Sequence, residues 1–182
     1  MHASLQKLFE RLEYQREVTV APFRSIVTEQ FNQSPRAGKW SAAEILSHIL
    51  TAERLSVMYM KKKMLGIDQL PRSGVWEAIK IAVLIASQRM PGLKFRAPRR
   101  VVENTIHHTS LPEIEKTWKE IRNDLHNLLD RIPPGRIDRK IYKDPAAGYL
   151  DARHALVFFR EHVIHHTPQL RKLLSQNATP TL

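Results

Sequence analysis

The stretch WSAAEILSHI, residues 40–49, marks the most sharply defined start of a helix in the chain. Ser41 precedes Glu44 by three residues, which is the spacing of a capping box in which each side chain accepts the other residue's amide proton. Trp40 and Ile45 stand where two apolar side chains can close over such a cap. The stretch therefore predicts a long helix with Ser41 as its N-cap.

The helix that follows this cap has an apolar inner face on which one histidine lies. His48 stands in the middle of that face, and the pattern continues to about Met64. Gly66 then ends the helix, since glycine favours the conformation that follows a helix C-terminus. The apolar positions recur at the spacing of a buried stripe and are Ile45, Ile49 and Ala52.

Another long amphipathic helix precedes this one. It runs from about Ser4 into the twenties, where Pro22 predicts a kink or break, because proline removes a hydrogen bond and clashes with the preceding turn. Residues 28–31 can add one short helical turn, and residues 35–39 form a connector.

Two further long helices are predicted in the second half of the chain. The first begins at a second capping box, Ser110 with Glu113, and is terminated by the Pro-Pro-Gly of residues 133–135. The last takes Asp151 as its N-cap and runs to about Ser175.

A crossover of residues 66–109 joins the second and third long helices. Within it, residues 75–90 predict an extra helix that is apolar nearly all round. Such a helix is buried, covers the bundle or contacts a second subunit. Residues 93–100 predict a basic, proline-containing loop.

Four long amphipathic helices with this crossover predict an all-α four-helix bundle. The helix order is expected to be up-down-down-up, because only short loops force successive helices to be antiparallel. Residues 1–176 are expected to form a single domain, which suits a chain of 182 residues. Residues 177–182 are expected to be a frayed tail.

The composition narrows the classes of function. The chain has no cysteine, so any metal must be held by nitrogen and oxygen. It shows no secretory signal and no apolar run near the ~18 residues of a membrane span, so a cytoplasmic location is expected. The net charge of +11 is compatible with nucleic-acid binding, but the basic residues are scattered along the chain, which argues against that function.

The stretch EHVIHH, residues 161–166, carries the strongest candidate for a site. His162 and His166 lie one turn, about 6 Å, apart on an otherwise apolar helix face. Together with His48 they could hold a divalent metal, and three protein ligands would leave a position for water or substrate. Imidazoles suit zinc, nickel, iron or copper. The alternative is that these are structural core histidines.

Other polar residues fit the metal site less well. His165 points about 100° away from its neighbours and is expected at the rim of the site. His154 lies ~12 Å along the helix axis from His162, too far to share the ion. Residues 107–108, His-His, belong to a loop. Glu44 could accept a proton from His48, but it competes for the capping box, which is the favoured role.

Three stretches resemble the DinB/YfiT-like superfamily: GKWSAAEILSHI at 38–49, GYL at 148–150 and EHVIHHTPQL at 161–170. The resemblance implies an up-down-down-up bundle and a homodimer. It also implies a divalent metal held by three histidines, which map onto His48, His162 and His166. Characterised bacterial members include transferases that use low-molecular-weight thiols such as bacillithiol or mycothiol, and an isomerase that acts on a thiol conjugate.

The leading hypothesis is a metal-dependent enzyme of the DinB-like class. A zinc, nickel or iron ion would activate a low-molecular-weight thiol or water, for transfer to a small electrophile or for its hydrolysis. No protein nucleophile can be identified. The alternative is a non-catalytic, dimeric stress-response or partner-binding bundle.

Overall fold

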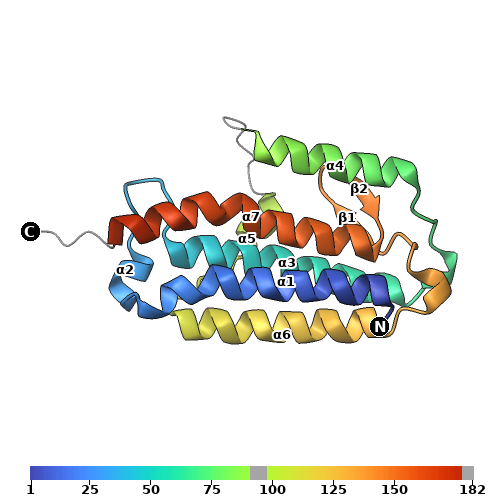
Figure 1. The fold of residues 1–182 in the computed structure, drawn as a ribbon, viewed down its shortest axis with the longest axis horizontal. Helices are drawn as coiled ribbons and strands as arrows, with labels where there is room; N and C mark the ends of the chain where they lie inside the picture. Colours follow the sequence, from blue (N-terminus) through green and yellow to red (C-terminus); the bar gives the residue numbers. More distant parts are fainter. Residues whose placement is uncertain (91–97, 178–182) are drawn as a thin grey trace, which may run out of the picture.

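The computed structural model describes residues 1–90 and 98–177, and within them the dominant feature is a bundle of four long helices (Figure 1). Following the colours of the chain, α1 and α7 run in one direction and α3 and α6 in the other, which is the up-down-down-up order. The fold is therefore all-α, as predicted. The long helices are α1 (Ala3–Val20), α3 (Ala42–Met64), α6 (Leu111–Asp130) and α7 (Ala152–Asn177).

Shorter elements connect the long helices. The crossover contains the predicted extra helix, and the end of the predicted basic loop is helical rather than irregular because Arg99 and Arg100 begin α5. The rest of that loop, at 93–97, and the predicted frayed tail from 178 onward lie outside the described residues. The connecting elements are η1 (Ala21–Ser25), α2 (Thr28–Asn32), η2 (Ile67–Gln69), α4 (Val75–Arg89), α5 (Arg99–Glu103), η3 (Pro134–Arg136), β1 (Tyr142–Asp144) and β2 (Gly148–Leu150).

Local sequence signals set the helix ends. The capping box at the start of α3 is complete: the Ser41 amide donates to Glu44 Oε2 at 2.8 Å, and the Glu44 amide donates to Ser41 Oγ at 3.2 Å. The α-helical part of the first helix ends at Val20, and Pro22 lies in the tighter η1 turn, so the expected break occurs there. Asp151 caps α7, because its Oδ1 accepts the amide proton of His154 at 3.1 Å.

The second predicted capping box, at the start of α6, is only half formed. Glu113 Oε2 accepts the Thr109 amide proton at 3.3 Å, but the Ser110 side chain caps no amide of the helix. The Ser110 hydroxyl is instead hydrogen-bonded to Glu113, which lowers the pKa of that carboxyl. Because the Ser110 hydroxyl donates to the Glu113 carboxylate, it does not accept the amide proton of Glu113 as a capping box requires.

The connector before α7 contains a small hairpin that the residue pattern does not predict. Asp144 Oδ1 accepts the amide protons of Ala146 and Ala147, both at 2.8 Å, and Gly148 adopts a φ of +80°. This turn pairs β1 with β2 in antiparallel register, with Tyr142 opposite Leu150. Both of these side chains are buried, so the hairpin contributes to the core.

A buried polar group, here called the Glu53 cluster, ties three helices together. It consists of Glu13 on α1, Glu53 on α3, and Trp118 and Arg122 on α6. Glu53 accepts hydrogen bonds from Trp118 Nε1 at 2.9 Å and from Arg122 Nε and Nη2 at 3.0 and 2.8 Å. Arg122 Nη1 donates to Glu13 Oε1 at 3.3 Å. Around this cluster the core is apolar.

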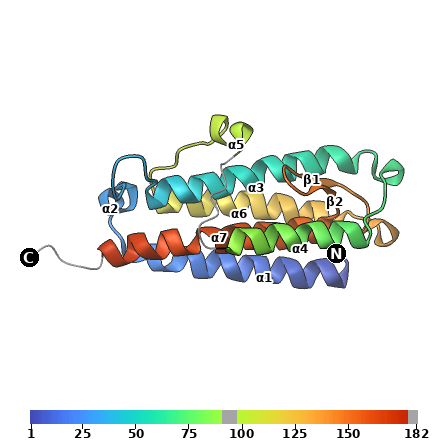
Figure 2. The ribbon, with the colours of Figure 1, turned by 90° about the horizontal axis from the view of Figure 1, so that it is seen from above.

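The extra helix α4 lies on the outside of the bundle, along α7 (Figures 1 and 2). It buries Ile81 and Leu84 and packs Ile85 partly against the core, whereas four other apolar side chains face outward. The predicted apolar helix therefore covers the bundle and also presents an apolar surface. This outer α4 face consists of Val75, Trp76, Ile79 and Val83, which are between 44% and 76% exposed. Among the described residues, no helix combines the length and hydropathy needed to cross a membrane.

Candidate metal centre

His48 of α3 meets His162 and His166 of α7 where these two helices pack together. One ring nitrogen from each histidine lies within 4.8 Å of the other two. The Nε2 atoms of His162 and His166 are 3.3 Å apart. Two nitrogens bound to one tetrahedral zinc ion at about 2.0–2.1 Å are ~3.3 Å apart, so this spacing fits a shared ion. We call the three residues the histidine cluster.

Aromatic side chains enclose the histidine cluster. Phe158, one turn before His162 on α7, stacks on the His162 ring at 5.7 Å with an interplanar angle of 9°. Trp40, just before the α3 cap, lies 5.1 Å from the His48 ring. The three histidines are consequently only 6–9% exposed, whereas Trp40 is 41% exposed and Phe158 is partly exposed. Both aromatic residues can therefore contact a ligand that approaches the cluster.

The hydrogen bonds of the cluster leave ring nitrogens available. His166 Nδ1 donates to Gln169 Oε1 at 2.8 Å, which leaves the lone pair of its Nε2 facing His162. His48 makes no hydrogen bond within the described parts of the chain. A neutral ring nitrogen that makes no hydrogen bond to the protein is available to serve as a metal ligand. The donor set therefore fits a metal ion.

Burial keeps the three imidazoles neutral. It lowers the pKa of His48 to about 4, with a smaller electrostatic contribution from His165. Burial likewise lowers the pKa of His166 to about 4, against the opposing effect of its hydrogen bond to Gln169. For His162, burial and then the neighbouring histidines hold the pKa well below its usual value. Neutral imidazole is the form that binds metal, so the cluster is ready to bind one at neutral pH.

The adjacent face of α7 is tied to α4. Glu161 is buried and accepts hydrogen bonds from Arg89 Nε at 3.1 Å and from Arg160 Nη1 at 2.9 Å. His165 Nδ1 donates to the Gln88 carbonyl at 3.0 Å. His165 thus lies beside the cluster with its Nδ1 directed at α4, in agreement with the predicted rim position. The Arg89–Glu161 contact was not predicted, because no local spacing relates residues 72 positions apart.

The remaining sequence candidates lie outside the cluster. His154 pairs with Asp151 in the first turn of α7. Residues 107–108 belong to the loop before α6, where the His108 amide donates to Ser47 Oγ at 3.1 Å. Glu44 is engaged in the α3 capping box, which was its favoured role.

The fold and the histidine cluster together define the class of protein. It is an all-α bundle whose second and last long helices bring together three histidines that could hold a metal ion. The chain matches the family model of the DinB superfamily over residues 11–170 and belongs to that superfamily. The matched range contains all three histidines of the cluster. Comparisons with curated proteins and with solved structures find no match.

Proposed function

We propose that the protein is a metal-dependent enzyme in which His48, His162 and His166 bind one divalent ion, either zinc, nickel or iron. The observation that supports this most is the convergence of three neutral, buried imidazoles. Membership of the DinB superfamily supports it as well. We further propose that residues 1–176 form a single domain that acts in the cytoplasm.

The proposed reaction is the transfer of a low-molecular-weight thiol to a small electrophile, or hydrolysis of that electrophile. A bound ion would supply Lewis acidity, lowering the pKa of a thiol or water in the position that three protein ligands leave open. Gln169 fixes the tautomer of His166. Trp40 and Phe158 flank the cluster with partly exposed rings, and these favour a substrate with an apolar or flat portion.

A reconstitution assay tests this function. Protein purified without a histidine tag would be incubated with zinc, nickel or iron, and then with a thiol and a chromogenic electrophile. The proposal expects metal-dependent conjugation or hydrolysis that is lost in the His162→Ala/His166→Ala variant and kept in His154→Ala. Stoichiometric metal binding without turnover of any thiol or electrophile would argue against an enzyme and for the non-catalytic alternative.

The second candidate function is a dimeric, partner-binding bundle, and the outer α4 face supports association of two copies. Its four apolar side chains are 44–76% exposed, and an exposed apolar patch of this kind is typical of a contact surface. Sedimentation should show a dimer that dissociates in the Trp76→Ser/Val83→Lys variant. Val27→Lys, at another exposed valine, is the matched control. A monomeric wild-type protein, or a variant that remains dimeric, would exclude this face as the subunit contact.

A further inference from the structure

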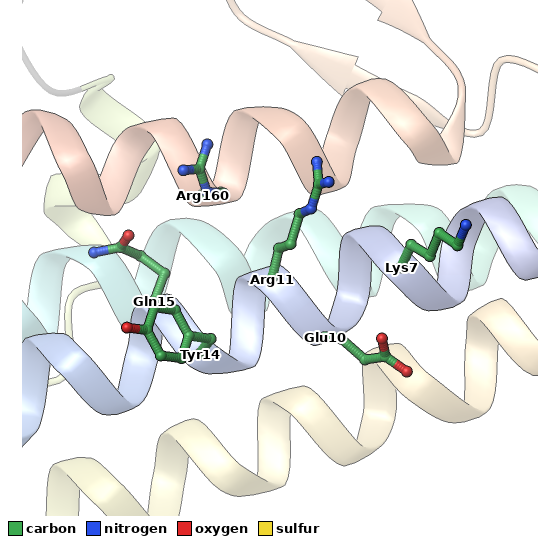
Figure 3. A pocket seen from close by; sticks show the side chains of 6 residues that line it. All are labelled: Lys7, Glu10, Arg11, Tyr14, Gln15 and Arg160. Carbon is green, nitrogen blue, oxygen red and sulfur yellow. The ribbon is translucent and has the colours of Figure 1, made fainter.

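A groove between α1 and α7 forms a second candidate site, and no residue of the histidine cluster lines it (Figure 3). Its volume is about 500 Å³, which is within the range of small-molecule sites. We call it the α1–α7 groove. It is lined by Lys7, Glu10, Arg11, Tyr14, Gln15 and Arg160.

Cationic side chains gather on the side of the groove nearest α7. Lys7, Arg11 and Gln15 follow one another at four-residue spacing, so they share one face of α1. Figure 3 shows Lys7 and Arg11 extending from α1 toward α7, where Arg160 lies. Glu10 extends away from α7, toward α6, and accepts a hydrogen bond from Gln6 at 2.8 Å. The carboxylate that lines the groove is therefore not directed at the cations.

Among the described residues, two of these three cations lack the counter-charges that a residue such as Arg24 has. Within the described residues, neither Lys7 nor Arg11 forms an ion pair, whereas Arg24 is paired with both Glu17 and Glu115. Arg160 donates one hydrogen bond, to Glu161, a carboxylate that Arg89 also contacts. Like charges one helical turn apart repel each other, so an anion between them would stabilise the arrangement.

We propose that the α1–α7 groove binds a small phosphate-bearing molecule. The planar guanidinium groups of Arg11 and Arg160 match the oxygens of a phosphate group, and Lys7 adds a compact positive charge. Tyr14 and Gln15 offer an aromatic ring and an amide to the uncharged part of the ligand. The groove is larger than a single phosphate requires. This binding does not depend on a metal in the histidine cluster.

Calorimetric titration with pyrophosphate at fixed ionic strength tests the proposal. The wild-type protein should bind with saturation, and the Lys7→Gln/Arg11→Gln variant should bind at least tenfold more weakly. Lys116→Gln/Lys119→Gln removes the same charge from exposed positions of α6 and should change the affinity less than twofold. Arg160→Gln, on α7, should also weaken pyrophosphate binding, and it tests the opposite side of the groove independently.

Several results would overturn the proposal. One is the absence of saturation by pyrophosphate, and another is an equal loss in the α6 control, which would mean that only the overall charge attracts the anion. Citrate binding as tightly as pyrophosphate would contradict a preference for phosphate. Tighter, steeply salt-dependent binding of duplex DNA would make the groove part of a nucleic-acid surface instead.

Discussion

The Glu53 cluster and the histidine cluster both bury polar side chains of α3, but their atoms are paired to different extents. Both carboxylate oxygens of Glu53 accept hydrogen bonds, from Trp118 and Arg122. In the histidine cluster, His48 has no hydrogen-bond partner within the described residues, and the rings of His162 and His166 direct nitrogens at each other. The first arrangement is complete as it stands, whereas the second suits an added ion.

This difference separates a structural group from a binding group. A fully paired buried cluster fixes how helices pack, and it loses stability when one partner is removed. A cluster with ring nitrogens still available can take up a ligand, and a ligand that binds the folded chain stabilises it. Substitutions in the two clusters should therefore change different measurements.

The largest expected effect is on stability, at the Glu53 cluster. Arg122→Met leaves the Glu53 carboxylate buried without its ionic partner and should lower the free energy of unfolding by about 3–5 kcal/mol. Chemical denaturation measures this, with the exposed Arg131→Met as control. The double variant Glu53→Met/Arg122→Met should be less destabilised than Arg122→Met alone. A loss below about 1 kcal/mol would mean that the cluster does not hold the helices together.

A smaller effect is expected on metal affinity, at the edge of the histidine cluster. Gln169→Ala removes the acceptor that orients His166 and should weaken metal binding about tenfold, the lower end of the usual range because Gln169 is exposed. Competition with a chelator measures the affinity. Gln176→Ala, two turns further along α7, should leave it unchanged. If Gln169→Ala bound the metal as tightly as the wild-type protein, the hydrogen bond from His166 to Gln169 would have no effect on how His166 binds the ion.

The smallest expected effect is on stability, at Glu77, a carboxylate in the first turn of α4. Hydrogen bonds from Lys140 and from the Gly74 amide lower the pKa of Glu77 from 4.5 to about 2. A lowered folded-state pKa gives a contribution to stability that is complete above pH 4.5 and is lost as the pH falls through about 2.

Glu77→Gln should accordingly cost about 1 kcal/mol at pH 7 and almost nothing near pH 2. Unfolding measured at both pH values, with the exposed Glu29→Gln as control, tests the sign. A cost that grows on acidification would contradict this account of how α4 is anchored.

The sequence predicted those features that neighbouring residues specify. The Ser41–Glu44 capping box and the break at Pro22 depend on contacts within one or two turns, so residue spacing was sufficient. The pairing of His162 with His166 is local in the same sense. The position of His48 on an apolar helix face, and the resemblance to the DinB superfamily, suggested it as the third ligand, and the structure places it beside the pair.

Long-range polar contacts could not be predicted in this way. Glu53 and Arg122 each stand among apolar positions, and no periodicity shows that they face each other across 69 residues. The presence of Arg11 and Arg160 in one groove likewise depends on how α1 packs against α7. The hairpin was missed because its turn is set by one side chain, Asp144, rather than by a run of strand-forming residues.

Metal content tests the central claim most directly. Protein purified without a histidine tag, reconstituted and desalted, should carry about one ion per chain by elemental analysis. The His162→Ala/His166→Ala variant should carry almost none, and the neighbouring His165→Ala variant should still carry about one. Metal retained by the double variant, or a wild-type protein that retains none after reconstitution, would contradict the assignment of the histidine cluster as a metal site.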